Sequence, residues 1–239
     1  MAWEIVLRGP ESALEELTHA FRDPRTTIVR TSDGFVLKGS RFAGLEDVSE
    51  VRRQATPIVE SLSGISRILL QSEASLGIGS VVEIRPNGSR NIFVELEPAV
   101  LRVTAGLVSL QVSHADGSVE ERRPSDPAPA WLTTALETPE AARALRLRDK
   151  RDLSWTDVYR LFEVVVAGAG GAEVVVREGW ASRTQLDRFK HSANSVSAAG
   201  DQARHGVERT APPADAMTIS EAPSLVDILL CRWLGKGAV

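Results

Sequence analysis

Four side chains that could carry out chemistry are concentrated in one short stretch of the C-terminal half: His191, Asn194, Arg204 and His205. Their segment, RFKHSANSVSAAGDQARHG, is poor in large apolar residues and is flanked by patterns typical of amphipathic helices. Because the ordinary pKa of an imidazole is about 6.5, His205 could act as a general base near neutral pH. Arg204 could hold a phosphate through a bidentate contact, and Asn194 and His191 could orient a substrate oxygen. These four residues form the candidate catalytic set.

The same residue types also organise loops, so a structural role is the alternative interpretation. Asn194 could cap the end of a helix. Arg204 could pair with Asp187 or Glu208, and His205 could hydrogen-bond a backbone carbonyl. We weigh this structural interpretation above the catalytic one, because polar networks hold many loops in place without doing chemistry.

Sequence motifs for well-known cofactor and catalytic sites are absent from the chain. It has no GxxxxGK[ST], GxGxxG, HExxH or GxSxG pattern. The glycine-rich GAGG at residues 168–171 follows a predicted helix and indicates a helix end. His191, Asp201 and His205 match no familiar metal-binding spacing, and the single cysteine, Cys231, excludes an internal disulfide and a cysteine-based zinc site. We therefore expect neither a metal nor a cofactor.

The charge balance gives no general attraction to nucleic acid or anionic lipid, since 28 basic and 32 acidic residues leave a net charge of −4. The basic run at residues 143–151 could contact nucleic acid, but a solvated helix face is the preferred interpretation. The chain has neither a basic, apolar leader nor a stretch of about 18–20 apolar residues. We expect a cytoplasmic protein with no membrane contact, and the abundance of Ala, Val, Arg and Gly suggests a bacterial source.

The N-terminal half has the patterns of an antiparallel sheet with two helices. Residues 2–8 alternate apolar and polar side chains as a half-buried strand does, and Asp33-Gly34 is typical of a hairpin turn. Helices are predicted at residues 11–21 and 45–62, and the second either kinks or restarts at Pro57, where Thr56 could cap it. Short strands, including LRVTA at 101–105, follow up to residue 123. We predict roughly seven or eight strands and an α+β domain over residues 1–123.

The chain then becomes mainly helical after a proline-rich segment. Residues 122–130, RRPSDPAPA, hold three prolines, which favours an extended, exposed linker at 124–130. The second domain, residues 131–239, shows helical spacing and capping residues such as Ser154 and Ser182. The state of residues 172–180 stays open between a strand and a helix. The predicted fold class is α+β, with a mainly antiparallel N-terminal sheet carrying two helices and a mainly α-helical C-terminal domain.

Three C-terminal segments resemble a group of bacterial proteins that has no assigned activity. The segments are SWTDVYRLFEVV, GWASRTQLDRFKHSANSVSAAGDQARHG and PPADAMTISEAPSLVDILLCRWL. The group is marked by an RFxHxAN segment, a GxxARH segment and a terminal PMTxxEA helix, and the resemblance covers roughly residues 154–234. It implies a family without implying a reaction.

The helical C-terminal half also has a distant resemblance to the HEPN superfamily of helical domains, many of which are metal-independent ribonucleases. That resemblance implies Arg204 as the phosphate-binding residue and His205 as the base, assisted by Asn194 and His191. HEPN ribonucleases usually separate the Arg and His by four to six residues, whereas Arg204 and His205 are adjacent here. Adjacent helical residues point about 100° apart, so an irregular backbone would be needed to aim both at one phosphate.

These observations favour a two-domain binding or interaction module with no established catalysis. The alternative is a HEPN-like ribonuclease of a defence or toxin–antitoxin system. The sequence leaves open whether the protein is an enzyme, and its partner could be another protein or an RNA.

Overall fold

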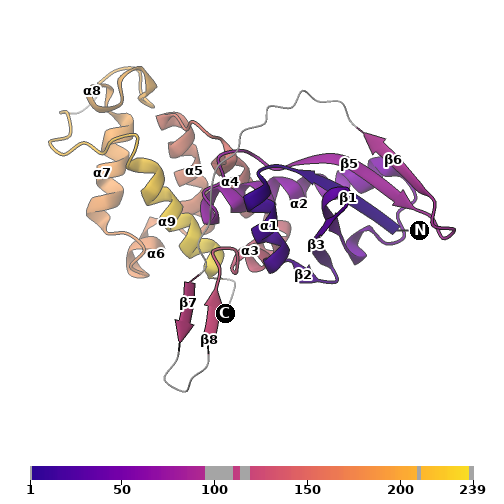
Figure 1. The fold of residues 1–239 in the computed structure, drawn as a ribbon. Coiled ribbons are helices and arrows are strands. Elements are labelled where there is room, and N and C mark those ends of the chain that lie inside the picture. Colours follow the sequence, from indigo (N-terminus) through magenta and orange to yellow (C-terminus); the bar gives the residue numbers. More distant parts are fainter. Residues whose placement is uncertain (1, 95–109, 114–118, 209–210, 237–239) are drawn as a thin grey trace. The chain divides into compact units, whose positions relative to one another are not determined.

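The structure is a computed structural model that describes residues 2–94, 110–113, 119–208 and 211–236. The chain forms two compact units, Met1–Leu136 and Glu137–Val239, which are called unit 1 and unit 2 below. Unit 1 holds an antiparallel sheet and unit 2 is built from helices (Figure 1). The predicted α+β fold class is confirmed.

The main sheet of unit 1 has the strand order β2-β3-β4-β1-β5-β6, and every neighbouring pair in it is antiparallel. Short connections join the pairs β2-β3, β3-β4 and β5-β6, as antiparallel pairing allows, whereas β1 pairs with β4 and β5 across longer stretches of chain. The strands are β1 (Ala2–Arg8), β2 (Arg22–Asp23), β3 (Thr26–Thr31), β4 (Gly34–Lys38), β5 (Gly77–Ile84) and β6 (Arg90–Val94).

Two helices, α1 (Glu11–Ala20) and α2 (Val48–Leu69), pack against this sheet (Figure 1). The alternation in β1 buries Trp3, Ile5 and Leu7, as the sequence predicts. Cross-strand pairing places Ile28 of β3 on the same face as Ile5, and Arg30, two residues further on, reaches Glu11 and Glu15 of α1. The helices therefore cover the face that carries the apolar side chains of β1.

The second helix does not restart at Pro57, because α2 continues through Pro57 to Leu69. Thr56 does not cap a new helix; its hydroxyl donates to the carbonyl of Arg52 within α2. Ile58 and Leu62, which follow the proline, are buried. Burial of this helix face offsets the one hydrogen bond that a proline removes.

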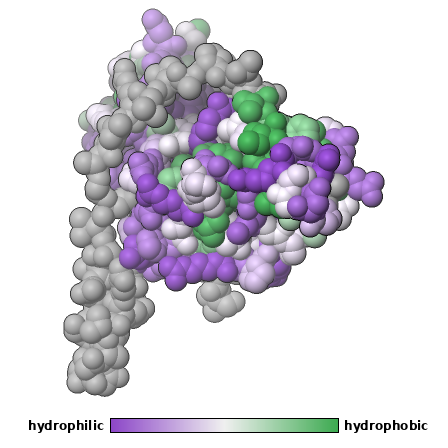
Figure 2. Space-filling model, turned by 45° about the vertical axis from the view of Figure 1, so that its right-hand side comes forward, coloured by the Kyte–Doolittle hydropathy of each residue, from purple (hydrophilic) through white to green (hydrophobic). Residues whose placement is uncertain are grey.

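The edge strand β6 exposes Ile92 and Val94, whose exposed fractions are 61% and 63%. Figure 2 shows hydrophobic surface bordered by hydrophilic residues on the side of the molecule that it brings forward.

A separate two-stranded sheet pairs β7 (Leu110–Ser113) with β8 (Val119–Arg122). The strand predicted at residues 101–105 lies outside the described residues.

The segment predicted as an extended linker, residues 124–130, is instead a turn followed by the start of helix α3 (Ala128–Glu137). Ser125 and Ala128 are fully buried, and the side chain of Glu16 accepts hydrogen bonds from Arg123 at 3.0 Å and Ser125 at 3.2 Å. Prolines suit this conformation, since the first turn of a helix does not need their missing N–H. The two compact units divide further along, after Leu136.

Unit 2 is helical, and residues 172–177, whose state the sequence left open, form a helix. Ser154 and Ser182 each begin a helix through a reciprocal capping box, with Asp157 and Gln185 respectively. The helices of unit 2 are α4 (Pro139–Asp149), α5 (Trp155–Gly168), α6 (Ala172–Arg177), α7 (Arg183–Asn194), α8 (Val196–Ala199) and α9 (Ala222–Gly235). Within the described part of the chain, no helix combines the length and the apolar character that crossing a membrane requires.

Candidate functional site

The segment that holds the predicted site residues runs from the last turn of α7 into an irregular loop. His191 and Asn194 belong to α7, and Arg204 and His205 follow α8 and a 3-10 turn at Gly200–Gln202. The backbone N–H of Arg204 donates to the carbonyl of Ala193 at 2.9 Å. The chain therefore returns to the end of α7 and brings the backbone of Arg204 close to that of Asn194.

The Arg204 side chain is attached to α5 by three contacts. Its guanidinium carbon lies 4.5 Å from the centroid of the Tyr159 ring, a cation–π arrangement. One terminal nitrogen is 3.4 Å from the Tyr159 hydroxyl, and the other is 3.3 Å from a carboxylate oxygen of Glu163. To hold a phosphate, Arg204 would have to leave an aromatic ring and a carboxylate. The predicted pairing of Arg204 with Asp187 or Glu208 is wrong, since its partner is Glu163.

The other three side chains have separate surroundings. His191 Nε2 lies 2.9 Å from the carbonyl oxygen of Ala211. Asn194 Oδ1 is buried with no hydrogen-bond partner. His205 is half-buried and forms no hydrogen bond or ion pair with the residues that the structure describes. No hydrogen bond or ion pair joins any two of these four side chains, all of which are described.

Glu208, an acidic residue of the loop, also has a structural contact. One carboxylate oxygen of Glu208 accepts the backbone N–H of Ser197 at 2.8 Å. This hydrogen bond stabilises the ionised carboxylate and lowers the pKa of Glu208 below its ordinary value. The contacts of Arg204 and Glu208 together connect the loop to α5 and α8.

Replacing Arg204 with methionine tests whether its contacts with Tyr159 and Glu163 hold the loop in place. We expect faster amide hydrogen exchange, by a few-fold, over residues 195–208, and a loss of about 0.5–1 kcal/mol in the free energy of unfolding, typical of an exposed cation–π contact. Hydrogen-exchange mass spectrometry measures the first and denaturant unfolding the second. Arg143, which is exposed on α4, supplies the control Arg143→Met. Unchanged exchange in the loop of Arg204→Met would show that the side chain does not hold it.

The residues weighed as metal ligands do not form a metal site. Among the described residues, no group of three or more His, Cys, Asp and Glu side chains is arranged to hold a metal ion. Burial raises the pKa of the Cys231 thiol to about 11, so this side chain stays protonated at neutral pH and is a poor nucleophile.

Two cations of the basic run at residues 143–151 have partners within unit 2. Arg148 makes a bidentate pair with Asp227, at 2.6 and 3.0 Å, which joins α4 to α9. Lys150 donates to Asp157 at 2.6 Å, and this bond together with that from Ser154 lowers the pKa of Asp157 to about 2. These contacts support the interpretation of the run as a solvated helix face with structural pairs.

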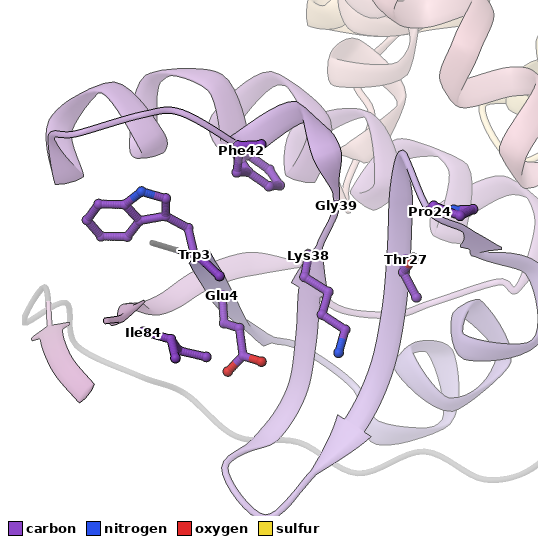
Figure 3. A pocket seen from close by; sticks show the side chains of 10 residues that line it. Trp3, Glu4, Pro24, Thr27, Lys38, Gly39, Phe42 and Ile84 are labelled. Carbon is purple, nitrogen blue, oxygen red and sulfur yellow. The ribbon is translucent and has the colours of Figure 1, made fainter. Parts of the chain in front are cut away.

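A cavity of about 370 Å³ lies in unit 1, where the ends of several strands meet (Figure 3). We call it the strand-end pocket. Its apolar lining comes from Trp3, Phe42 and Ile84, and its charged lining from Glu4 and Lys38. The other lining residues are Ala2, Pro24, Thr27, Gly39 and Ala43.

Close backbone packing gives the strand-end pocket its shape. A Cβ atom at Gly39 would lie 2.2 Å from the carbonyl oxygen of Arg25, so only glycine fits this approach. The backbone N–H of Ser40 donates to the carbonyl of Pro24 at 3.0 Å, and the indole N–H of Trp3 donates to the carbonyl of Leu45 at 2.8 Å. These contacts hold the segment after β4 against the turn before β3, and they fix the Trp3 ring on the side of β1 opposite to Glu4 (Figure 3).

The charged groups of the strand-end pocket come from adjacent strands. Glu4 belongs to β1 and Lys38 to β4, and Figure 3 shows the two side chains projecting side by side. A carboxylate oxygen of Glu4 is 3.4 Å from Arg90 of β6, which also pairs with Asp33. Lys38 forms no ion pair or hydrogen bond with any residue that the structure describes.

A second cavity of unit 1, of about 400 Å³, is lined by Arg8, Arg52 and Glu60, among others. Its two arginines donate to backbone carbonyls, Arg8 to Ile78 at 3.2 and 2.7 Å and Arg52 to Phe93 at 3.3 Å. Through these bonds, Arg8 of β1 contacts β5 and Arg52 of α2 contacts β6. This distinguishes the second cavity from the strand-end pocket, where Lys38 has no such contact.

Sequence analysis missed the strand-end pocket because its members are far apart in the chain. Glu4 is the polar position of an alternating strand, and Lys38 ends another, which is ordinary for residues at a solvated face. The one usable signal was the hairpin around Asp33-Gly34, since it fixes where β4 ends. Comparisons of the chain with protein-family models, curated proteins and solved structures find no match.

Proposed function

We propose that the protein is a binding module and that the strand-end pocket of unit 1 receives a small organic ligand. The observation that carries the proposal is the composition of this cavity. It combines apolar walls with a carboxylate from Glu4 and an ammonium group from Lys38 that has no partner among the described residues. Small-molecule sites are mostly apolar with a few placed polar groups, and they occupy about 300–1,000 Å³.

The rigidity of its surroundings suits this pocket to binding. Trp3 and Phe42, with exposed fractions of 5% and 2%, pack on the side of the strands opposite to Glu4 and Lys38, and the Trp3 ring is fixed there by its hydrogen bond to Leu45 (Figure 3). Walls that are already ordered reduce the entropy that a ligand must otherwise offset on binding. This packing keeps the strands that carry Glu4 and Lys38 in place and supports ligand binding without a large rearrangement of unit 1.

The contacts of Arg204 favour a binding module over the ribonuclease alternative. A HEPN-like mechanism needs Arg204 to hold a phosphate beside His205. In the structure the Arg204 guanidinium is engaged by Tyr159 and Glu163, and no hydrogen bond joins it to His205. We therefore assign the ligand site to unit 1 and a structural role to the loop of unit 2.

Nuclear magnetic resonance of the full chain tests the proposal. We would add mixtures of small carboxylic acids, amines, amino acids and nucleosides to the ¹⁵N-labelled protein. The expected result is a shift of the Trp3 indole N–H and of the Lys38 and Gly39 backbone resonances, with the resonances of α7 unchanged.

Two tryptophan substitutions separate occupation of the pocket from non-specific binding. Ala43 lines the mouth of the strand-end pocket and is exposed, so Ala43→Trp should fill the space and abolish the shifts. Ala74 is equally exposed but lies outside the pocket lining, so Ala74→Trp should leave them intact. The proposal fails if no mixture moves these resonances, or if the shifts persist in Ala43→Trp.

A further inference from the structure

We propose that the edge strand β6 is a dimer interface and that its partner is β6 of a second copy of this chain. The two strands would pair antiparallel about a two-fold axis at Ile92, so that the main sheet continues from one copy into the other. This inference concerns the edge of the sheet and does not depend on a ligand in the strand-end pocket.

The backbone of β6 has one side available for pairing. In the part of the chain that the structure describes, β6 is the last strand of the main sheet (Figure 1). In the turn before it, the N–H of Arg85 donates to the carbonyl of Ser89 at 3.0 Å. Bonded pairs alternate along an antiparallel ladder, so every second residue of β6 directs its N–H and C=O away from β5. These residues are Arg90, Ile92 and Val94.

The side chains at this edge are apolar and exposed. Ile92 and Val94 belong to the few large apolar residues of the described chain that are exposed. Edge strands are usually protected by lysine, proline or a bulge. β6, with the sequence RNIFV, contains neither lysine nor proline, and its one charged side chain, Arg90, is already paired with Glu4 and Asp33. An apolar edge without these protections favours pairing with another strand.

The sequence of β6 is complementary to itself in the antiparallel direction. With Ile92 opposite Ile92 of the second copy, all five residues of the strand have a partner. Arg90 then lies opposite Val94, which keeps the two arginines at opposite ends of the interface, and like charges do not face each other. The charge of Arg90 is also offset within its own chain. A second copy therefore matches this edge, and two-fold dimers are the commonest homo-oligomers.

Sedimentation velocity of the full chain tests the proposal. One strand pair is a small interface, so we expect a dissociation constant of about 1–100 µM. Over a concentration range that brackets this value, the mean mass should rise from 25.9 kDa toward twice that value. A mass that stays at 25.9 kDa at every concentration would overturn the proposal.

Charged substitutions at Ile92 test whether β6 is the interface. Ile92→Lys and Ile92→Glu each place like charges opposite one another at the two-fold axis, so each should raise the dissociation constant at least about tenfold. An equimolar mixture places lysine opposite glutamate and should dimerise more strongly than either variant alone. Ile228 is also exposed but lies on α9, so Ile228→Lys should dimerise like the unmodified chain.

Replacement of Ile92 with proline tests strand pairing itself. Proline keeps apolar surface at this position and removes only an N–H that points away from β5, which an edge strand tolerates. Ile92→Pro should therefore weaken dimerisation as strongly as the charged variants do. Denaturant unfolding checks that each variant is folded, as expected for an exposed position. A dimer that none of the Ile92 substitutions weakens, or a lysine–glutamate mixture that gains nothing, would place the interface elsewhere and overturn the inference.

Discussion

Replacing Phe189 with alanine is expected to lower the free energy of unfolding of unit 2 by about 3–5 kcal/mol, the usual cost of removing a buried aromatic ring. The Phe189 side chain is fully buried. Its ring centroid lies 4.6 Å from that of Phe162, 5.9 Å from that of Tyr159 and 6.0 Å from that of Trp155. The substitution leaves a cavity among three large rings, which cannot all move inward to fill it.

Denaturant unfolding followed by tryptophan fluorescence measures this loss, because Trp155 is one of the rings in contact with Phe189. Asp187 is exposed on the same helix, so Asp187→Ala should change the free energy by less than about 0.5 kcal/mol. A loss below about 1 kcal/mol in Phe189→Ala would mean that the aromatic cluster is not the core of unit 2.

Replacing Gly168 with alanine is expected to cost about 1–3 kcal/mol, although alanine is ordinarily the better helix former. Gly168 is the last residue of α5, and a Cβ atom there would lie 2.1 Å from an atom of the Trp233 ring in α9. Real Cβ atoms do not approach so closely, so the Trp233 ring or the helix must move. The same denaturant unfolding measures the cost.

A double-mutant cycle with Trp233→Leu isolates the clash. The Gly168→Ala change should cost less when Trp233 is already leucine, because the large ring is gone. Gly235 ends α9 with open space around its Cα, so Gly235→Ala is the matched control and should be nearly neutral. Additive effects of the Gly168 and Trp233 substitutions would exclude contact between these two positions as the cause.

Local sequence patterns predicted much of the fold because their physical cause is local. The alternation of β1 buries Trp3, Ile5 and Leu7 as a period of two requires. The capping box at Ser154 depends only on a residue three positions away, and it forms as predicted. Such features need no information about distant parts of the chain.

Prolines predicted the local structure less well than strand alternation and helix capping did. Pro57 was expected to kink or restart a helix, and prolines at 124–130 were expected to make an extended linker. In the structure, α2 passes through Pro57, and residues 124–130 form a turn and the start of α3. Burial of Ile58 and Ala128 outweighs the local preference of proline.

At the candidate site, too, the sequence pattern and the tertiary contacts lead to different conclusions. Sequence analysis selected His191, Asn194, Arg204 and His205 because polar side chains were concentrated along the chain. The structure gives Arg204 its contacts with Tyr159 and Glu163, residues more than forty positions earlier. Concentration along the chain did not indicate convergence in space, because each side chain is oriented by its own neighbours.

By itself, the sequence determined the α+β class, most helices and strands, and the residues that start the helices of unit 2. These properties follow from hydrogen bonding and hydrophobic periodicity between near neighbours. Only the tertiary structure decided that Arg204 rests on Tyr159, and that Glu4 and Lys38 share one cavity with Trp3 and Phe42. The physical reason is strand pairing: it brings together residues more than thirty positions apart, and no local pattern in either strand records its partner.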